Sequence, residues 1–184
     1  MIISICGMSG SGKSNVAKLL AEKLGMKHYS IGDIRRNMAI ERNITLKRLN
    51  DVGEHQKFTD KQADDKCFKL GKEEANFVID GRLVYHFIPE SVKIFLKSHL
   101  RIRAEKAYID EKKMEEFRDL GDAIAALIGR EKSDQYRFKK YYEIDCNNEL
   151  QYDLIINTDY LSFEEVVDKV IEFLKKESIL KEVA

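Results

Sequence analysis

The sequence has few of the residues that break helices or cross-link a chain. Its 184 residues include one proline, Pro89, and 35% of them are charged, which is typical of a helix-rich, well-solvated protein. The three cysteines, Cys6, Cys67 and Cys146, are odd in number and form no Cys-x-x-Cys pair. The sequence therefore indicates neither a disulfide framework nor a zinc site, and we expect reduced thiols in a cytoplasmic protein.

Net charge of either sign is also lacking, because 32 Lys and Arg residues balance 32 Asp and Glu residues. This balance argues against a general nucleic-acid or membrane-surface binder, so an anionic ligand would need a local basic cluster. The apolar N-terminal run is too short for a signal peptide or a membrane span. We therefore expect small-molecule partners, no nucleic acid, no membrane, and a monomer by default.

A complete phosphate-binding motif follows the first apolar run. The template Gly-x-x-x-x-Gly-Lys-Ser/Thr is met at every fixed position by the stretch Gly7, Met8, Ser9, Gly10, Ser11, Gly12, Lys13 and Ser14. Glycines let the backbone curl around a phosphate, and the helix that follows adds the positive end of its dipole. Lys13 is then placed to reach the β and γ phosphates of ATP, and the Ser14 hydroxyl to bind Mg²⁺. A turn that matches by accident is the alternative, but the strand before and the helix after favour the functional interpretation.

Short apolar runs alternate with helical patterns along the rest of the chain. The runs predict strands at residues 2–6, 27–30, 77–79, 92–96 and 152–157. Five strands separated by helices imply right-handed βαβ crossovers, and hence an α/β fold with a five-stranded parallel sheet covered by helices on both faces. We expect a single domain over residues 1–184, with an insertion at about 31–75 and a lid at about 108–137.

Charged residues are expected at the carboxyl ends of these strands, where such sheets bind their ligands. Asp80 directly follows an apolar strand, which is where a phosphate-binding fold places a carboxylate that holds Mg²⁺; a turn-forming Asp-Gly is the alternative. Arg82 opens towards the same cleft. Arg35 and Arg36 follow the second strand, and each alone is explained by a solvated helix face. Several arginines around one crevice nevertheless favour a second anion site.

A further arginine pair lies in a predicted helix over residues 131–143 and just before it. Arg130 and Arg137 are seven residues apart and so project from one helix face, where Asp134 can orient either guanidinium. An ordinary charged surface is the alternative. The preceding segment, 110–129, is charged and contains glycines, so we expect a mobile excursion that closes these arginines over transferring phosphates and excludes water.

The other candidates have weaker patterns. The four histidines show no ligand spacing and are expected in packing or surface roles: His28, His55, His86 and His99. Asp60 and Asp64 could contact a sugar or base, but spacing alone favours a solvated helix face. Arg101 and Arg103 could contact a nucleotide, and a charged helix start explains them equally well. No Ser-His-Asp or Cys-His arrangement indicates another nucleophile.

With these residues, the chain resembles the nucleoside monophosphate kinases, and most closely the archaeal-type cytidylate kinases, from the N-terminus to about residue 175. The segment Ser30 to Arg36 is similar to the family motif Ser-x-Gly-Asp/Glu-x-x-Arg, which makes Arg36, not Arg35, the expected clamp on the acceptor phosphate. Asp80-Gly81-Arg82-Leu83 resembles the family's Asp/Glu-Gly-Arg-Leu, so Arg82 inherits an acceptor-binding role. The resemblance also makes Asp64 a base or ribose contact.

The resemblance implies Mg²⁺-dependent transfer of the γ-phosphoryl group of ATP to CMP or dCMP. Ser14 and Asp80 would hold the metal. The catalytic residues implied are Lys13, Arg130 and Arg137, and the acceptor-binding residues implied are Ser30, Arg36, Asp64 and Arg82. Two alternatives stay open: a kinase for UMP, AMP or dephospho-coenzyme A, and a switch that binds ATP without transferring phosphate.

Overall fold

The structure is a computed structural model that describes residues 1–109 and 117–177. A sheet of five strands lies at its centre in the order β2-β3-β1-β4-β5, and every neighbouring pair is parallel. The strands are β1 (Ile2–Gly7), β2 (Lys27–Ser30), β3 (Phe77–Asp80), β4 (Val92–Lys97) and β5 (Leu154–Asn157). The predicted five-stranded parallel sheet is confirmed.

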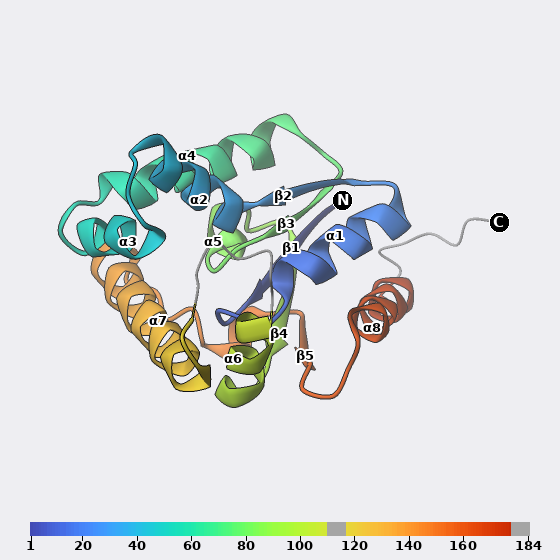
Figure 1. Cartoon of the computed structure of the whole chain (residues 1–184). Helices are drawn as coiled ribbons and strands as arrows, with labels where there is room; N and C mark the ends of the chain where they lie inside the picture. The colour runs from blue at the N-terminus through green and yellow to red at the C-terminus, as the bar shows by residue number, and fades with distance from the viewer. Residues whose placement is uncertain (110–116, 178–184) are drawn as a thin grey trace.

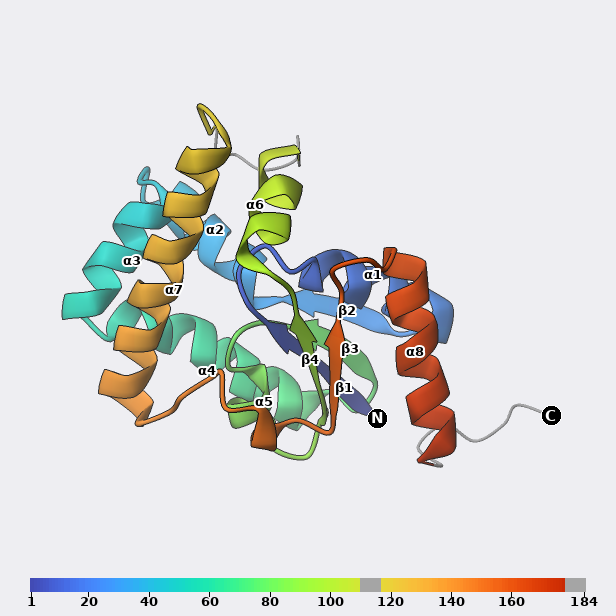
Figure 2. The same ribbon diagram turned by 90° about the horizontal axis from the view of Figure 1, so that it is seen from below.

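Helices cover both faces of this sheet, as predicted (Figures 1 and 2). They are α1 (Lys13–Leu24), α2 (Ile31–Glu41), α3 (Leu46–His55), α4 (Phe58–Glu73), α5 (Val84–Phe87), α6 (Leu100–Ile109), α7 (Leu120–Tyr142) and α8 (Phe163–Lys176), with a short 3₁₀ turn at Glu149–Gln151. Helices α1 and α8 lie side by side on one face. Helix α5 packs on the opposite face, and α2, α3, α4 and α7 gather beside the sheet at one side of the molecule.

The apolar run of β1 becomes the central strand because both of its faces are covered. Ile3, Ile5 and Cys6 have no exposed surface. Ile3 and Ile5 pack with residues of α1 and α8, whereas Cys6 packs with residues of α4 and α5 on the other face. Side chains in a strand alternate between faces, so a continuous apolar run is what a strand buried on both sides requires.

The parallel register brings the carboxyl ends of β1, β2 and β3 to one edge of the sheet. Ser30 at the end of β2 is paired with Asp80 at the end of β3, and Asp80 is also opposite Ile5 of β1. The loop that follows β1 therefore starts beside Asp80 and Ser30. This register alone places the phosphate-binding motif next to the two residues predicted to lie around it.

Helix α7 begins earlier than the sequence predicts. The expected excursion over 110–129 was drawn from charge and from Gly121 and Gly129, but the helix starts at Leu120, where the Asp119 side chain accepts a hydrogen bond from Asp122 N at 2.8 Å. An N-cap of this kind satisfies a free helix N–H, and tertiary packing outweighs the low helix propensity of two glycines. Residues 110–116 lie outside the described part of the chain.

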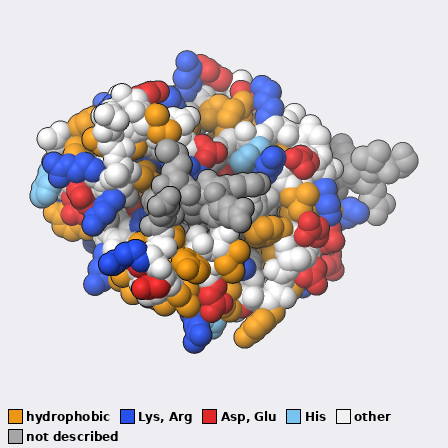
Figure 3. Space-filling model, viewed as in Figure 1, with side chains coloured by type: hydrophobic (Ala, Val, Ile, Leu, Met, Phe, Trp, Pro, Cys, Tyr) orange, Lys and Arg blue, Asp and Glu red, His pale blue; other side chains and the backbone are white. Residues whose placement is uncertain are grey.

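The surface agrees with the balanced composition. On the face shown in Figure 3, acidic and basic side chains are interspersed rather than gathered by sign. None of the helices in residues 1–109 and 117–177 combines the length and the apolar character needed to cross a membrane.

Helix α3 approaches α4 and α7 closely at Gly53. A Cβ added to Gly53 would lie 2.8 Å from Thr59 Oγ1, 3.1 Å from Arg137 Cδ and 3.3 Å from Asp60 Oδ2. Real Cβ atoms do not approach oxygen that closely without a shift of the neighbours. Because Gly53 has no side chain, α3 can pack closely against Thr59, Asp60 and Arg137.

We predict that Gly53→Ala lowers the free energy of unfolding by about 1–3 kcal/mol, because the new methyl group overpacks this contact. Gly129→Ala is the matched control, since Gly129 also lies within a helix and nothing is within 4 Å of its added Cβ. The control should gain about 0.5–1 kcal/mol from helix propensity. Urea denaturation of both variants checks this, and equal effects would contradict the packing described for α3.

Candidate active site

The phosphate-binding motif forms a tight loop between β1 and α1. Gly7 and Gly12 have φ angles of 141° and 83°, in the region that favours glycine. A Cβ on Gly7 would lie 2.4 Å from Leu96 O, and one on Gly12 would lie 2.7 Å from a ring carbon of Phe163. Backbone conformation and space thus both require glycine at these positions, as the template predicts.

Lys13 is the first residue of α1, and its Nζ donates to Met8 O at 2.7 Å. The ammonium therefore lies over its own loop, where incoming phosphate oxygens can replace the carbonyl. Burial lowers the pKa of Lys13 to about 8, with Arg82 lowering it further and Asp80 opposing the shift. Lys13 is still mostly protonated near neutral pH, as a phosphate ligand must be.

Asp80 is the point where three elements meet. Its Oδ2 accepts hydrogen bonds from Ser14 Oγ at 2.8 Å and from Ser30 Oγ at 3.2 Å. Its Oδ1 lies 2.8 Å from His28 Nε2. The Asp80 side chain is 3% exposed, so this carboxylate is held by protein donors from α1 and β2. The structure therefore brings three of the predicted residues, Ser14, Ser30 and Asp80, into direct contact.

Arg36, the predicted acceptor clamp, lies at the surface. Its side chain is 39% exposed and forms an ion pair with Asp33. Ser30 is the N-cap of the same helix, α2, and its Oγ accepts from Asp33 N at 3.3 Å. Exposed ion pairs contribute little free energy, so Arg36 is held weakly in this position.

Arg35, by contrast, faces inward. Its two terminal nitrogens donate to Asp60 Oδ1 at 2.7 Å and to Asn50 Oδ1 at 2.8 Å. Both Asp60 and Asn50 are buried. The solvated helix face expected for Asp60 is therefore wrong, and α4 instead turns this carboxylate into the interior, where it can pair with guanidinium groups.

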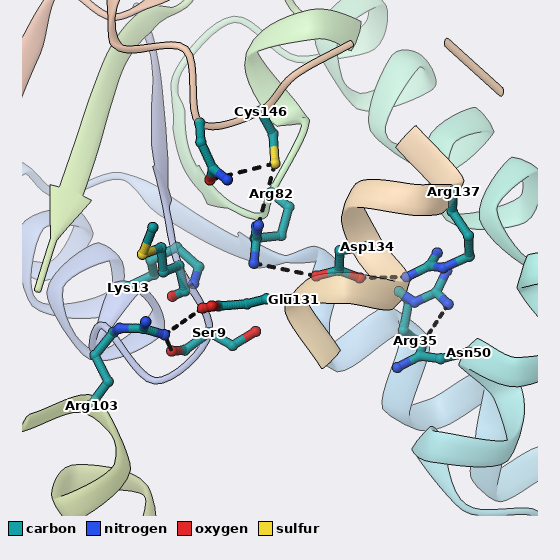
Figure 4. A network of polar contacts seen from close by, with 12 residues as sticks. Ser9, Lys13, Arg35, Asn50, Arg82, Arg103, Glu131, Asp134, Arg137 and Cys146 are labelled. Carbon is teal, nitrogen blue, oxygen red and sulfur yellow. Dashed lines mark hydrogen bonds and ion pairs between the residues drawn. The ribbon is translucent and has the colours of Figure 1, made fainter. Parts of the chain in front are cut away.

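Helix α7 contributes a buried row of charges, drawn in Figure 4. Arg137 is 1% exposed and forms ion pairs with Asp134 on its own helix and with Asp60 on α4. The other oxygen of Asp134 lies 3.3 Å from Arg82 Nη1, and Arg82 Nη2 lies 3.3 Å from Cys146 Sγ. The predicted residues Arg82 and Arg137 are thus joined through Asp134, while Arg130 lies partly buried on α7, about two turns before Arg137.

The sequence left two interpretations of Arg103 open, a nucleotide contact and a charged helix start, and the structure shows that this side chain is buried rather than part of a solvated helix start. Arg103 is 3% exposed; its Nη1 donates to Ser9 O in the phosphate loop at 2.7 Å and its Nε to Ser98 O at 3.0 Å. It also forms an ion pair with Glu131 of α7. Arg103 therefore ties the loop to α7.

A signal for Arg103 was present in its helical position. It lies on the same face of α6 as the buried residues Ala104 and Ala107, whereas Arg101 is exposed and pairs with Glu105. A charged residue on an apolar helix face needs a partner.

For His28 no comparable signal exists in spacing, because its partner Asp80 is on another strand.

Asp64, expected from spacing on a solvated face, is partly buried and accepts a hydrogen bond from Tyr142 Oη. Burial raises the pKa of Asp64 to about 6, and the bond from Tyr142 opposes the shift. Asp64 lies on α4 one turn after Asp60, so the two carboxylates lie on the same side of this helix. This position agrees with a contact to an acceptor nucleotide, which stays a prediction.

We predict that Asp64→Asn is more stable than the parent above about pH 6. A carboxyl whose folded pKa lies above its unfolded value of 3.8 favours the folded state at low pH and loses that contribution as pH rises to about 6. The amide keeps an acceptor for Tyr142 without a buried charge, so the gain at pH 7.5 should be about 1–3 kcal/mol. Denaturant titrations at pH 4.5 and pH 7.5 measure it.

Asp65→Asn serves as the control, because Asp65 is the next residue and is exposed. It should change the stability little at either pH. If Asp64→Asn behaved like the control at both pH values, the buried environment described for Asp64 would be wrong.

The fold is shared with solved structures of P-loop kinases. The chain resembles a shikimate kinase from Bacteroides thetaiotaomicron with a TM-score of 0.65 at 16% identity, covering 95% of this chain and 98% of that chain. An uncharacterized protein from Eubacterium ventriosum gives a TM-score of 0.69 at 20% identity, covering 95% and 98%. These likenesses show that the chain shares its fold, a parallel sheet covered by helices, with these proteins.

Sequence comparison narrows the class. Residues 2–160 match the model of the cytidylate kinase-like family. Among curated relatives, the cytidylate kinase of Sulfolobus acidocaldarius is 35% identical over 182 residues, 97% of each chain, and that of Methanocella arvoryzae is 36% identical over 179 residues, 96% of this chain and 99% of the relative. The chain therefore belongs to the cytidylate kinase-like family, which confirms the predicted class of nucleoside monophosphate kinase.

Proposed function

We propose that this protein transfers the γ-phosphoryl group of ATP to CMP or dCMP, giving ADP and CDP or dCDP. Family membership supports the reaction class, and the names of the curated relatives support cytidylate as the acceptor. The structural observation that carries the proposal is a set of guanidinium groups beyond the phosphate loop: Arg35, Arg82 and Arg137 all pair with Asp60 or Asp134. A protein that only binds ATP has no need of this second set.

The loop between β1 and α1 is the proposed ATP site. Its backbone N–H groups and the N-terminus of α1 would bind the phosphates, while Lys13 exchanges Met8 O for β and γ phosphate oxygens. Arg103 holds the loop in place by donating a hydrogen bond to Ser9 O. The loop can therefore keep its shape when the ligand arrives, which lowers the cost of binding.

Ser14 and Asp80 fit a Mg²⁺ ion, because they offer two hard oxygens that already lie 2.8 Å apart. In the described residues, no group of three or more His, Cys, Asp or Glu side chains could hold a metal. This suits an ion that takes its remaining ligands from phosphate and water. When bound, Mg²⁺ supplies neutralisation of charge between the β and γ phosphates.

The acceptor is placed among α2, α4 and α7. Ser30 contacts Asp80, and Arg82 is held by Asp134 of α7. Arg36 can leave its weak surface pair with Asp33 to hold the acceptor phosphate. Asp64 would contact the base or ribose. In-line transfer requires an oxygen of the acceptor phosphate to approach the γ-phosphorus of ATP from the side opposite the ADP leaving group.

Arg130 and Arg137 are the proposed stabilisers of the transferring group. Arg137 is held by Asp60 and Asp134, so these carboxylates keep its guanidinium oriented before substrates bind. Phosphate oxygens would then compete with the carboxylates for the same donors. Closure of α7 over both nucleotides would exclude water, and ATP would be transferred to the acceptor rather than hydrolysed.

The reaction is tested by incubating the protein with Mg·ATP and separate acceptors: CMP, dCMP, UMP, AMP, GMP and dephospho-coenzyme A. We expect the highest kcat/KM for CMP or dCMP. A different preferred acceptor would keep the phosphoryl transfer and replace the substrate. Nucleotide binding without any phosphorylated product would contradict the proposal and favour the ATP-binding switch.

We predict that Lys13→Met abolishes transfer and stabilises the protein. Loss of the ammonium should reduce kcat/KM at least about 100-fold, since it removes charge stabilisation at the phosphates. A base whose folded pKa, about 8, is below its unfolded value of 10.5 destabilises the fold at lower pH, and this cost fades as pH rises from about 8 to 10.5. The variant should therefore gain about 1–3 kcal/mol at pH 7.

Lys18→Met is the matched control, because Lys18 lies on the same helix and is exposed. It should keep the activity. Activity retained in folded Lys13→Met, or lost equally in the control, would contradict the role given to Lys13; thermal unfolding at pH 7 measures the stability of both variants.

A further inference from the structure

His28 lies outside the motif residues, yet its ring contacts the carboxylate at their centre. It is the second residue of β2, and its Nε2 lies 2.8 Å from Asp80 Oδ1. An ionised carboxylate only accepts hydrogen bonds, so the ring nitrogen is the donor. His28 had been expected in a packing or surface role, and this contact shows instead a defined polar partner.

The sheet explains why these groups converge. Side chains alternate along a strand, so His28 and Ser30 of β2 project from the same face, as do Val78 and Asp80 of β3. Val78 packs in the core formed with α1 and α8, so this is the face that α1 covers. Ser14, the second residue of α1, therefore meets Asp80 from the same side.

The two oxygens of Asp80 have separate partners. Oδ2 accepts from Ser14 and Ser30, at 2.8 and 3.2 Å, whereas His28 is the donor recorded for Oδ1 within the described part of the chain. The hydroxyl of Ser14 can offer an oxygen lone pair to a metal while its O–H still donates to Asp80 Oδ2. His28 holds the other oxygen, Oδ1, and so opposes rotation of the carboxylate from the side that the two serines do not reach.

We propose that His28 is a positioning residue that fixes the rotation of the Asp80 carboxylate and so keeps Oδ2 directed at the divalent cation bound with ATP. This inference rests on the proposed ATP and Mg²⁺ site, but not on the identity of the acceptor. Partners that orient metal-binding groups commonly change metal affinity about 10- to 100-fold when they are removed.

A purely structural role is the main alternative, in which His28 only joins β2 to β3. Two observations argue against it. The strands are already held in register by their backbone pairing, with His28 opposite Val78 and Ser30 opposite Asp80. The His28 side chain is 21% exposed, so the strand does not depend on its packing for a dry core. Loss of the ring should therefore leave the fold intact.

The experiment uses Mn²⁺ as the probe and a non-hydrolysable ATP analogue, with no acceptor present. The Mn²⁺ dissociation constant is measured by electron paramagnetic resonance for the parent, His28→Ala and His28→Gln. Gln can reach Asp80 Oδ1 with an amide donor. Tyr29→Phe is the control, because it removes a 2.6 Å hydrogen bond to Glu74 from the next residue of the same strand, on the opposite face. Affinity for the analogue is also measured in EDTA.

We expect His28→Ala to weaken Mn²⁺ binding at least about 10-fold, His28→Gln to restore it to within about threefold, and Tyr29→Phe to leave it unchanged. Affinity for the analogue in EDTA should stay the same in all variants. Unchanged Mn²⁺ binding in His28→Ala, equal losses in the Ala and Gln variants, or an equal loss of analogue affinity in EDTA would overturn the proposal.

The result is separable from the proposed function. If no acceptor is phosphorylated but the Mn²⁺ series behaves as expected, the kinase proposal fails and the role of His28 stands. If CMP is phosphorylated and His28→Ala binds Mn²⁺ normally, the role of His28 fails alone.

Discussion

Burial of charged side chains is the constraint on which this structure depends. Arg35, Arg82, Arg103 and Arg137 have little or no exposed surface, and a buried ion is tolerated only when a partner and further hydrogen bonds compensate for lost solvation. Each of these arginines has a partner on another element, so these ion pairs also fix the position of one element relative to another. Removal of either partner would leave an uncompensated buried charge.

Helix α7 shows the consequence most clearly. Glu131 pairs with Arg103, which holds the phosphate loop, and Asp134 pairs with Arg82 after β3. Arg137 then reaches Asp60 on α4. One helix therefore connects the proposed ATP site to the proposed acceptor site through residues spaced three apart, and a displacement of α7 would be felt at both sites.

The features predicted best from the sequence are those that depend on residues close together in the chain. The phosphate loop was predicted because Gly7 and Gly12 need conformations and space that other residues lack, and the sheet because continuous apolar runs suit strands covered on both faces. Asp80 was located by the rule that ligands bind at the carboxyl ends of parallel strands. The roles of the site residues stay predictions.

Long-range pairing is what the sequence could not reveal. His28 meets Asp80 across 52 residues, and Arg137 meets Asp60 across 77. Spacing within one helix placed Asp60 in solvent because its partners belong to other elements. The start of α7 was missed because glycine and charge indicate a loop locally, whereas the packing of that helix decides otherwise.

The central claim is that the two phosphate sites cooperate in transfer rather than in hydrolysis. The most direct measurement follows the label from [γ-³²P]ATP in the presence of Mg²⁺ and CMP, separating CDP from inorganic phosphate. The account predicts that the label appears in CDP in large excess and that little phosphate forms. Label released as inorganic phosphate at the same rate with and without CMP would contradict it.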